Sequence, residues 1–132
     1  MTLPSVSPVR SARIGNVAVI YASDYLNRFN GERLERECRL RLGEGCRALV
    51  VDFRHTDLVN SIGVSMLRGV IDVAEKAGAR LIFADVNGQA AQLFELLGLM
   101  RDVALAPNEQ AALTLLAESE TTTTADTTPH SD

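Results

Sequence analysis

The sequence has 132 residues, a mass of 14.3 kDa and a formal net charge of −4 at pH 7, a size typical of one domain. With 46% hydrophobic residues and a mean hydropathy of +0.06, wholesale disorder is excluded. Four of the 17 acids and no base lie in residues 117–132, which leaves 13 acids against 13 bases elsewhere. A neutral body lacks the basic surface that nucleic acid or anionic lipid requires, so we expect neither as a partner.

The first residues predict a leader followed by a hairpin. Prolines favour a flexible leader over residues 1–8, before an edge strand near Val9–Ile14. Gly15-Asn16 is a two-residue turn signal, and the apolar run Val17–Ala22 predicts a strand buried on both faces. The start of the chain lacks the layout of a secretory signal, and no apolar run approaches the roughly 18 residues of a membrane span. We therefore expect a cytoplasmic protein.

A helix is predicted over Glu32–Leu42, with an apolar residue recurring every four positions. Three glutamates precede an arginine by four residues, the favourable order for ion pairs on a helix: Glu32–Arg36, Glu35–Arg39 and Glu37–Arg41. We therefore interpret the five arginines between positions 33 and 47 as a solvated, self-paired face. Cys38 and Cys46 are interpreted as small buried residues rather than as a disulfide or a zinc site.

The rest of the chain alternates strands and helices. The predicted elements are strand Ala48–Phe53, loop Arg54–Asn60, helix Ser61–Ala77, strand Arg80–Ala84, helix Ala90–Leu97, short strand Val103–Leu105 and helix Glu109–Leu116. This order predicts an α/β fold: a mostly parallel sheet of four to five strands, with one antiparallel edge, packed with about four helices. The domain spans residues 9–117. Residues 118–132 lack periodicity and predict a disordered, acidic and Thr-rich tail.

Common catalytic signatures are absent from the sequence. It contains neither a glycine-rich phosphate loop nor a nucleophile elbow. Asp52 and Asp85 end two buried strands, where ligands of parallel sheets gather, so a metal or phospho-acceptor role is one interpretation. A turn or capping role is the simpler one.

Ser61 lies at the predicted start of a helix, after a short polar loop. Free backbone N–H groups and the helix dipole favour an anion there, and a phosphoryl group would add about −1.5 to −2 charges. Gly63 in the first turn leaves room for another backbone to approach. The simpler interpretation is that Asn60 or Ser61 only caps the helix.

Several segments resemble one family in matching order. Val59–Val64, which reads VNSIGV, resembles the signature of STAS domains, the fold of bacterial anti-sigma factor antagonists, where a hydrophobic residue precedes Asp-Ser-Ser/Ala-Gly-Leu-Gly. Similar segments are Leu26-Asn27, Gly78–Ile82, Gln92–Leu99 and Glu109–Leu113, so that the resemblance covers residues 9–117. Asn60 and Asn27 stand where the family has Asp, which removes two negative charges.

The resemblance implies a binding module rather than an enzyme. Its partner would be an anti-sigma factor with serine kinase activity, released when the kinase phosphorylates Ser61. ATP and magnesium would belong to the kinase, so we expect no cofactor or metal here. The resemblance implies these partner-binding residues: Asn27, Thr56, Asn60, Ser61, Ile62, Gly63 and Val64. Thr56 is a second candidate acceptor, with a loop hydroxyl bonded to backbone as its simpler interpretation.

Two other functions stay open at this point. One is an unphosphorylated STAS scaffold in a larger signalling or transport complex, and the other is a small α/β enzyme or ligand binder that uses Asp52, Asp85 and the Asn60-Ser61 loop. Homo-oligomerisation is also open.

Overall fold

The computed structural model describes residues 9–101 and 103–127, with backbone alone beyond residue 118. Five strands form the main sheet in the order β1-β2-β4-β6-β7. Their bounds are β1 Ser11–Ile14, β2 Val17–Tyr21, β4 Ala48–Asp52, β6 Arg80–Ala84 and β7 Ala104–Ala106. β1 pairs antiparallel with β2, and the other three pairs are parallel. The predicted mostly parallel sheet with one antiparallel edge is confirmed.

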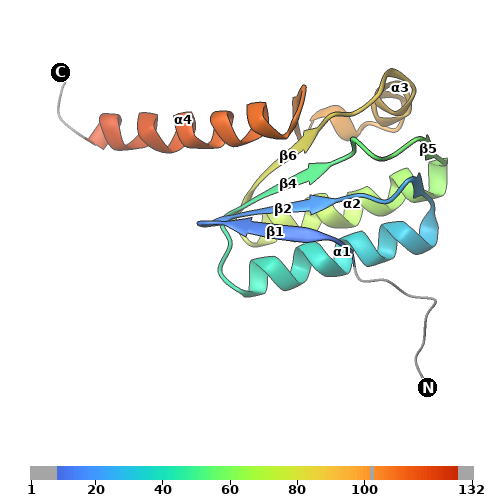
Figure 1. Ribbon diagram of the computed structural model, residues 1–132, viewed down its shortest axis with the longest axis horizontal. Coiled ribbons are helices and arrows are strands. Elements are labelled where there is room, and N and C mark those ends of the chain that lie inside the picture. Colours follow the sequence, from blue (N-terminus) through green and yellow to red (C-terminus); the bar gives the residue numbers. More distant parts are fainter. Residues whose placement is uncertain (1–8, 102, 128–132) are drawn as a thin grey trace.

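Four α-helices accompany the sheet in the described part of the chain: α1 Arg28–Gly43, α2 Ser61–Lys76, α3 Gly88–Leu96 and α4 Glu109–Thr127. A single 3-10 turn, η1, spans Leu99–Arg101. Figure 1 shows α1 and α2 side by side against one face of the sheet, with α4 across the other face. The fold is therefore a three-layer α/β arrangement.

Alternating strand residues supply two separate cores. Ile20, Val51 and Phe83 belong to the larger core, between the sheet and helices α1 to α3. Their neighbours Val50 and Ile82 belong to the smaller core, which α4 covers through Ala112 and Leu116. Because successive strand side chains point to opposite faces, a continuous apolar run fills both cores. Cys38 and Cys46 are buried free thiols, as expected, and burial raises the pKa of Cys38.

Helix α1 begins at Arg28, earlier than the predicted Glu32, because Asn27 caps it: its Oδ1 accepts a hydrogen bond from the N–H of Asn30 at 2.9 Å. The early start brings Arg28 onto the helix, where its guanidinium lies 3.4 Å from the carboxylate of Glu32. Glu32 therefore pairs with Arg28 rather than with Arg36. The other two predicted pairs are confirmed, Arg39–Glu35 at 2.6 Å and Arg41–Glu37 at 3.4 Å.

Helix α4 runs to Thr127 instead of ending at Leu116, which corrects the predicted start of the disordered tail. The sequence has no helix-breaking glycine or proline between Glu109 and Pro129, so nothing local ends the helix before that proline. The residue that precedes a proline disfavours the helical conformation, which sets the limit of the helix. The helix therefore continues past Leu116, the last buried residue among the described side chains. The predicted leader over residues 1–8 and the last residues of the tail, 128–132, lie outside the described residues.

Candidate functional site

Two helices begin side by side at one edge of the molecule. Strand β3, Tyr25–Leu26, pairs in parallel with strand β5, Leu58–Val59, to form a second, two-stranded sheet. The residue after each strand is the N-cap of a helix: Asn27 for α1 and Asn60 for α2. Figure 1 shows the starts of both helices at the same end of the molecule. This pairing brings Asn27 next to the Asn60-Ser61 loop.

Asn60 organises the first turn of α2. Its Oδ1 accepts a hydrogen bond from the N–H of Gly63 at 2.7 Å, and its Nδ2 donates to the hydroxyl of Tyr25 at 3.1 Å. Its backbone N–H donates to the carbonyl oxygen of Leu26 at 3.1 Å. One residue therefore caps the helix and ties it to the β3 segment. The simpler interpretation of Asn60 as the N-cap is confirmed.

Gly63 allows the close contact between these two segments. A Cβ added to Gly63 would overlap the carbonyl group of Leu26 and would lie 2.9 Å from the Cα of Asn27. The room expected beside Gly63 is therefore filled by backbone of the same chain. This contact fixes the position of the first turn of α2 and of the serine that begins it.

Ser61 is the first residue of α2, and its side chain is exposed. Its carbonyl oxygen accepts a hydrogen bond from Ser65 Oγ at 2.9 Å, while its hydroxyl bonds to no other described residue. The first turn of α2 contains no acidic side chain. The Ser61 hydroxyl is therefore accessible to another protein, at a helix end that favours an added anion.

Exposed apolar side chains lie near the start of α2. Ile62 is 54% exposed, Phe29 54%, Leu58 52% and Tyr25 37%. A groove between the two helix starts is lined by Tyr25, Asn27, Arg28, Phe29, Glu32, Asn60 and Ile62. We call the four exposed apolar residues, Tyr25, Phe29, Leu58 and Ile62, the apolar rim. Contiguous apolar residues bordered by polar ones are typical of protein-binding surfaces.

The structure separates the predicted partner-binding residues into two groups. Asn27, Asn60, Ser61 and Ile62 lie together on the accessible face. Thr56, Gly63 and Val64 are buried, which corrects the expectation that they contact a partner.

Each of the three buried residues has a structural role. Thr56 Oγ1 donates a hydrogen bond to the carbonyl oxygen of Ser23 at 2.6 Å, which confirms its simpler interpretation. Val64 belongs to the larger core, and Gly63 packs against Leu26. Sequence reasoning missed three members of the apolar rim, Tyr25, Phe29 and Leu58, because an apolar residue in a sequence is ordinarily assigned to the core.

The strand-end acids form a separate polar cluster. Asp52 is 1% exposed; its Oδ1 accepts a hydrogen bond from the N–H of Arg54 at 2.9 Å, and its Oδ2 has no partner. Burial raises the pKa of Asp52, and the bond from Arg54 partly offsets the rise. Burial also raises the pKa of Tyr21, whose hydroxyl donates to Glu109 at 2.9 Å. Asp85 occupies a turn with a φ of 57°.

The cluster fits the turn role predicted for Asp52 and Asp85 better than a metal site. Across the described residues, no three His, Cys, Asp or Glu side chains are placed to hold a metal ion.

None of the helices in the described part of the chain is long and apolar enough to cross a bilayer.

Comparisons with known proteins were made on both sequence and structure. No curated protein matches the sequence. A variant of RsbS from Moorella thermoacetica has 20% identity and a TM-score of 0.76, over 86% of this chain and 98% of that chain. An anti-sigma factor antagonist from Mycobacterium paratuberculosis has 20% identity and a TM-score of 0.67, over 87% and 97%. The Bacillus cell fate determinant SpoIIAA in its phosphorylated form has 16% identity and a TM-score of 0.65, over 82% and 98%.

These structural similarities concern the fold, and the sequence comparison adds the family. The family model described as "STAS domain" matches residues 9–112, which include both strands of the main hairpin, the Asn60-Ser61 loop and the first residues of α4. The resemblance inferred from the sequence is thereby confirmed, and the chain belongs to the STAS domain family.

Proposed function

We propose that this protein is an anti-sigma factor antagonist. It binds an anti-sigma factor that is also a serine kinase, and phosphorylation of Ser61 releases that partner. The observation that carries the proposal is the exposed Ser61 hydroxyl at the start of α2, next to Ile62 of the apolar rim. Solved structures with the same fold include several described as anti-sigma factor antagonists, one of them in a phosphorylated form.

Release follows from electrostatics rather than from unfolding. A phosphate on Ser61 faces the free N–H groups of the first turn of α2, where negative charge is favourable, so the helix remains folded. The same phosphate adds a charge of about −2 next to Ile62. A partner surface that covers Ile62 would have to desolvate the phosphate without pairing it, and this cost dissociates the complex.

The proposal places the protein in the cytoplasm, as a binding module with no catalytic activity and no cofactor of its own. ATP and magnesium are bound by the kinase. A second candidate function is an unphosphorylated scaffold in a larger signalling or transport complex. It is supported by the neutral side chains of Asn27 and Asn60 beside Ser61 and by the similarity of the fold to a protein of the stressosome, at 19% identity.

Incubation with an anti-sigma kinase encoded nearby, with Mg²⁺ and ATP, tests the proposal by mass spectrometry of the intact protein and its peptides. We expect one added phosphate, on the peptide that contains Ser61, and none on the Ser61→Ala variant. Ser65→Ala is the matched control, because Ser65 is exposed on the same helix. That variant should be phosphorylated as the parent is. Absence of phosphate on the parent, while the same kinase binds it tightly, would support the scaffold instead.

A further inference from the structure

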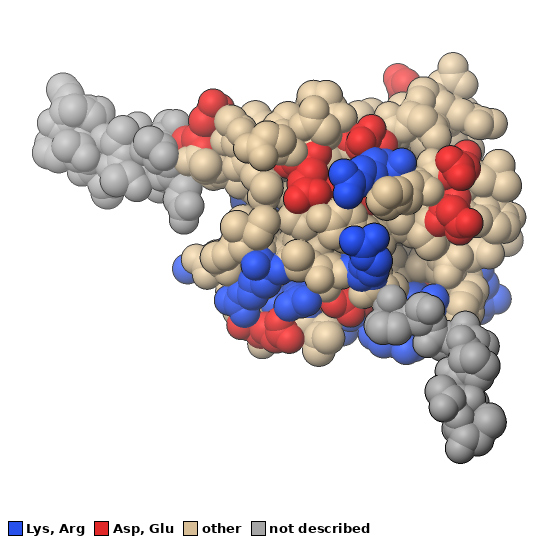
Figure 2. Space-filling model, viewed as in Figure 1, with Lys and Arg blue, Asp and Glu red and all other residues tan. Residues whose placement is uncertain are grey.

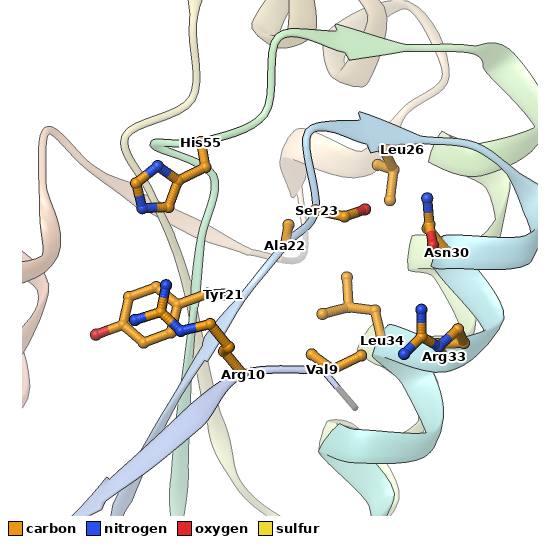
Figure 3. A pocket seen from close by; sticks show the side chains of 10 residues that line it. All are labelled: Val9, Arg10, Tyr21, Ala22, Ser23, Leu26, Asn30, Arg33, Leu34 and His55. Carbon is orange, nitrogen blue, oxygen red and sulfur yellow. The ribbon is translucent and has the colours of Figure 1, made fainter. Parts of the chain in front are cut away.

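A second cavity lies apart from the groove next to Ser61. It measures about 310 Å³ and lies between strand β2, helix α1 and the segment that precedes β1. Its apolar part is formed by Val9, Leu26 and Leu34. Figure 3 shows these side chains pointing into a common space, with Arg10 and Tyr21 on one side and Arg33 on the other. Small-molecule sites commonly have about 300–1,000 Å³, mostly apolar walls and a few polar groups.

The charged groups of this cavity all have the same sign. Arg10 and Arg33 line it, and no acidic side chain does. Within the described residues neither arginine forms an ion pair with a carboxylate. Instead, each guanidinium lies over an aromatic ring, Arg10 at 5.2 Å from the centroid of Tyr21 and Arg33 at 5.5 Å from that of Phe29.

His55 also belongs to the lining of this cavity. Its Nε2 accepts a hydrogen bond from Nε of Arg54 at 3.3 Å. Figure 2 shows several basic side chains, with acidic ones among them, on the side of the molecule where β1 and α1 lie. The arginines are the planar, weakly hydrated cations that suit a carboxylate.

We propose that this cavity binds a small organic anion, with its acidic group between Arg10 and Arg33 and an apolar body against Val9, Leu26 and Leu34. A cation would meet two positive charges and no acid. A neutral apolar molecule would fill the space without pairing with either guanidinium group, both of which remain accessible to water. The proposal does not require that Ser61 be phosphorylated.

The cavity also shares a segment with the α2 start. The side chain of Leu26 lines the cavity, while its carbonyl oxygen accepts the hydrogen bond from Asn60. A bound anion therefore contacts the residue that holds the first turn of α2. Amide resonances of Ser23, Leu26 and Leu34 are the expected reporters of binding in an NMR titration, because all three residues line the cavity.

The test titrates the full chain with octanoate, and in parallel with octyl phosphate, octan-1-ol and acetate. We expect saturable shifts of the three reporter amides with octanoate, and no saturation with octan-1-ol or with acetate over the same range. Tighter binding of octyl phosphate than of octanoate would identify a phosphate rather than a carboxylate as the preferred acidic group. Arg10→Gln and Arg33→Gln should each weaken binding about tenfold, the usual scale for one hydrogen-bonded charge.

Arg36→Gln is the matched control, since Arg36 is exposed on α1 and does not line the cavity. It should bind octanoate as the parent does. Equal binding of octan-1-ol and octanoate, or unchanged affinity in both lining variants, would overturn the proposal. So would octanoate binding seen only after residues 2–8 are deleted, because the chain's own N-terminal segment would then be the occupant of the cavity.

Discussion

Substitution of Gly63 by alanine tests the contact that positions Ser61. Within a helix, glycine to alanine ordinarily stabilises a protein by about 1 kcal/mol. At Gly63 the added methyl group would overlap the carbonyl group of Leu26 and approach the Cα of Asn27 to 2.9 Å. All of these are backbone atoms, and the hydrogen bond from Asn60 to Leu26 at 3.1 Å holds them in place.

The methyl group therefore requires a shift of the β3 segment or of the first turn of α2, by about 1 Å if normal carbon contacts are to be restored. Overpacking of this kind costs about 1–3 kcal/mol or more, which exceeds the gain in helix propensity. We expect Gly63→Ala to lower the free energy of unfolding by roughly 2 kcal/mol.

Urea unfolding followed by circular dichroism measures this change. We expect the free energy of unfolding to fall with urea concentration at the same slope in the parent and in the variant. Gly43→Ala is the control, because Gly43 is also a helical residue and nothing lies within 4 Å of its added Cβ. It should leave the stability unchanged or raise it by up to about 1 kcal/mol. If Gly63→Ala proves as stable as Gly43→Ala, the close contact between the two segments is not the constraint inferred here.

The remaining predictions concern the partner, the buried acid and the tail. Ser61→Asp should weaken binding of the anti-sigma kinase by supplying part of the phosphate charge, and unchanged affinity in a binding assay would count against the switch. Ile62→Ala should lower the same affinity several-fold with little change in melting temperature, whereas Leu96→Ala, 80% exposed on α3, should not. Burial raises the pKa of Asp52 above its ordinary 3.8. The destabilisation caused by its ionised carboxylate therefore grows as the pH rises from 3.8 to the raised pKa, and it is constant above that. Asp52→Asn should therefore raise the melting temperature at neutral pH, with a gain that disappears near pH 3; a constant gain at every pH contradicts this reasoning. Deletion of residues 118–132 should leave the melting temperature nearly unchanged, because Leu116 is the last buried residue among the side chains that the structure describes, and a fall of many degrees would refute this.

The amino-acid sequence by itself determined the local elements and their order. A continuous apolar run and apolar residues at helical spacing depend on neighbouring residues only, so the strand predicted at Ala48–Phe53 and the helix predicted at Ser61–Ala77 each end within one residue of the observed bounds. The N-cap role of Asn60 is also local, since its side chain reaches an N–H three residues along the chain. For the same reason the first residue of α2, the centre of the candidate site, could be identified before the fold was known.

Only the tertiary structure decided what surrounds that residue. The pairing of Tyr25 with Leu58 joins segments 33 residues apart and has no local signature in two-residue strands. It leaves Tyr25 exposed and buries Thr56, although sequence patterns alone favour the opposite assignment for an aromatic residue and a threonine. Exposure depends on which distant segments cover a side chain, and two helix starts can share one surface only after the sheet has brought them together.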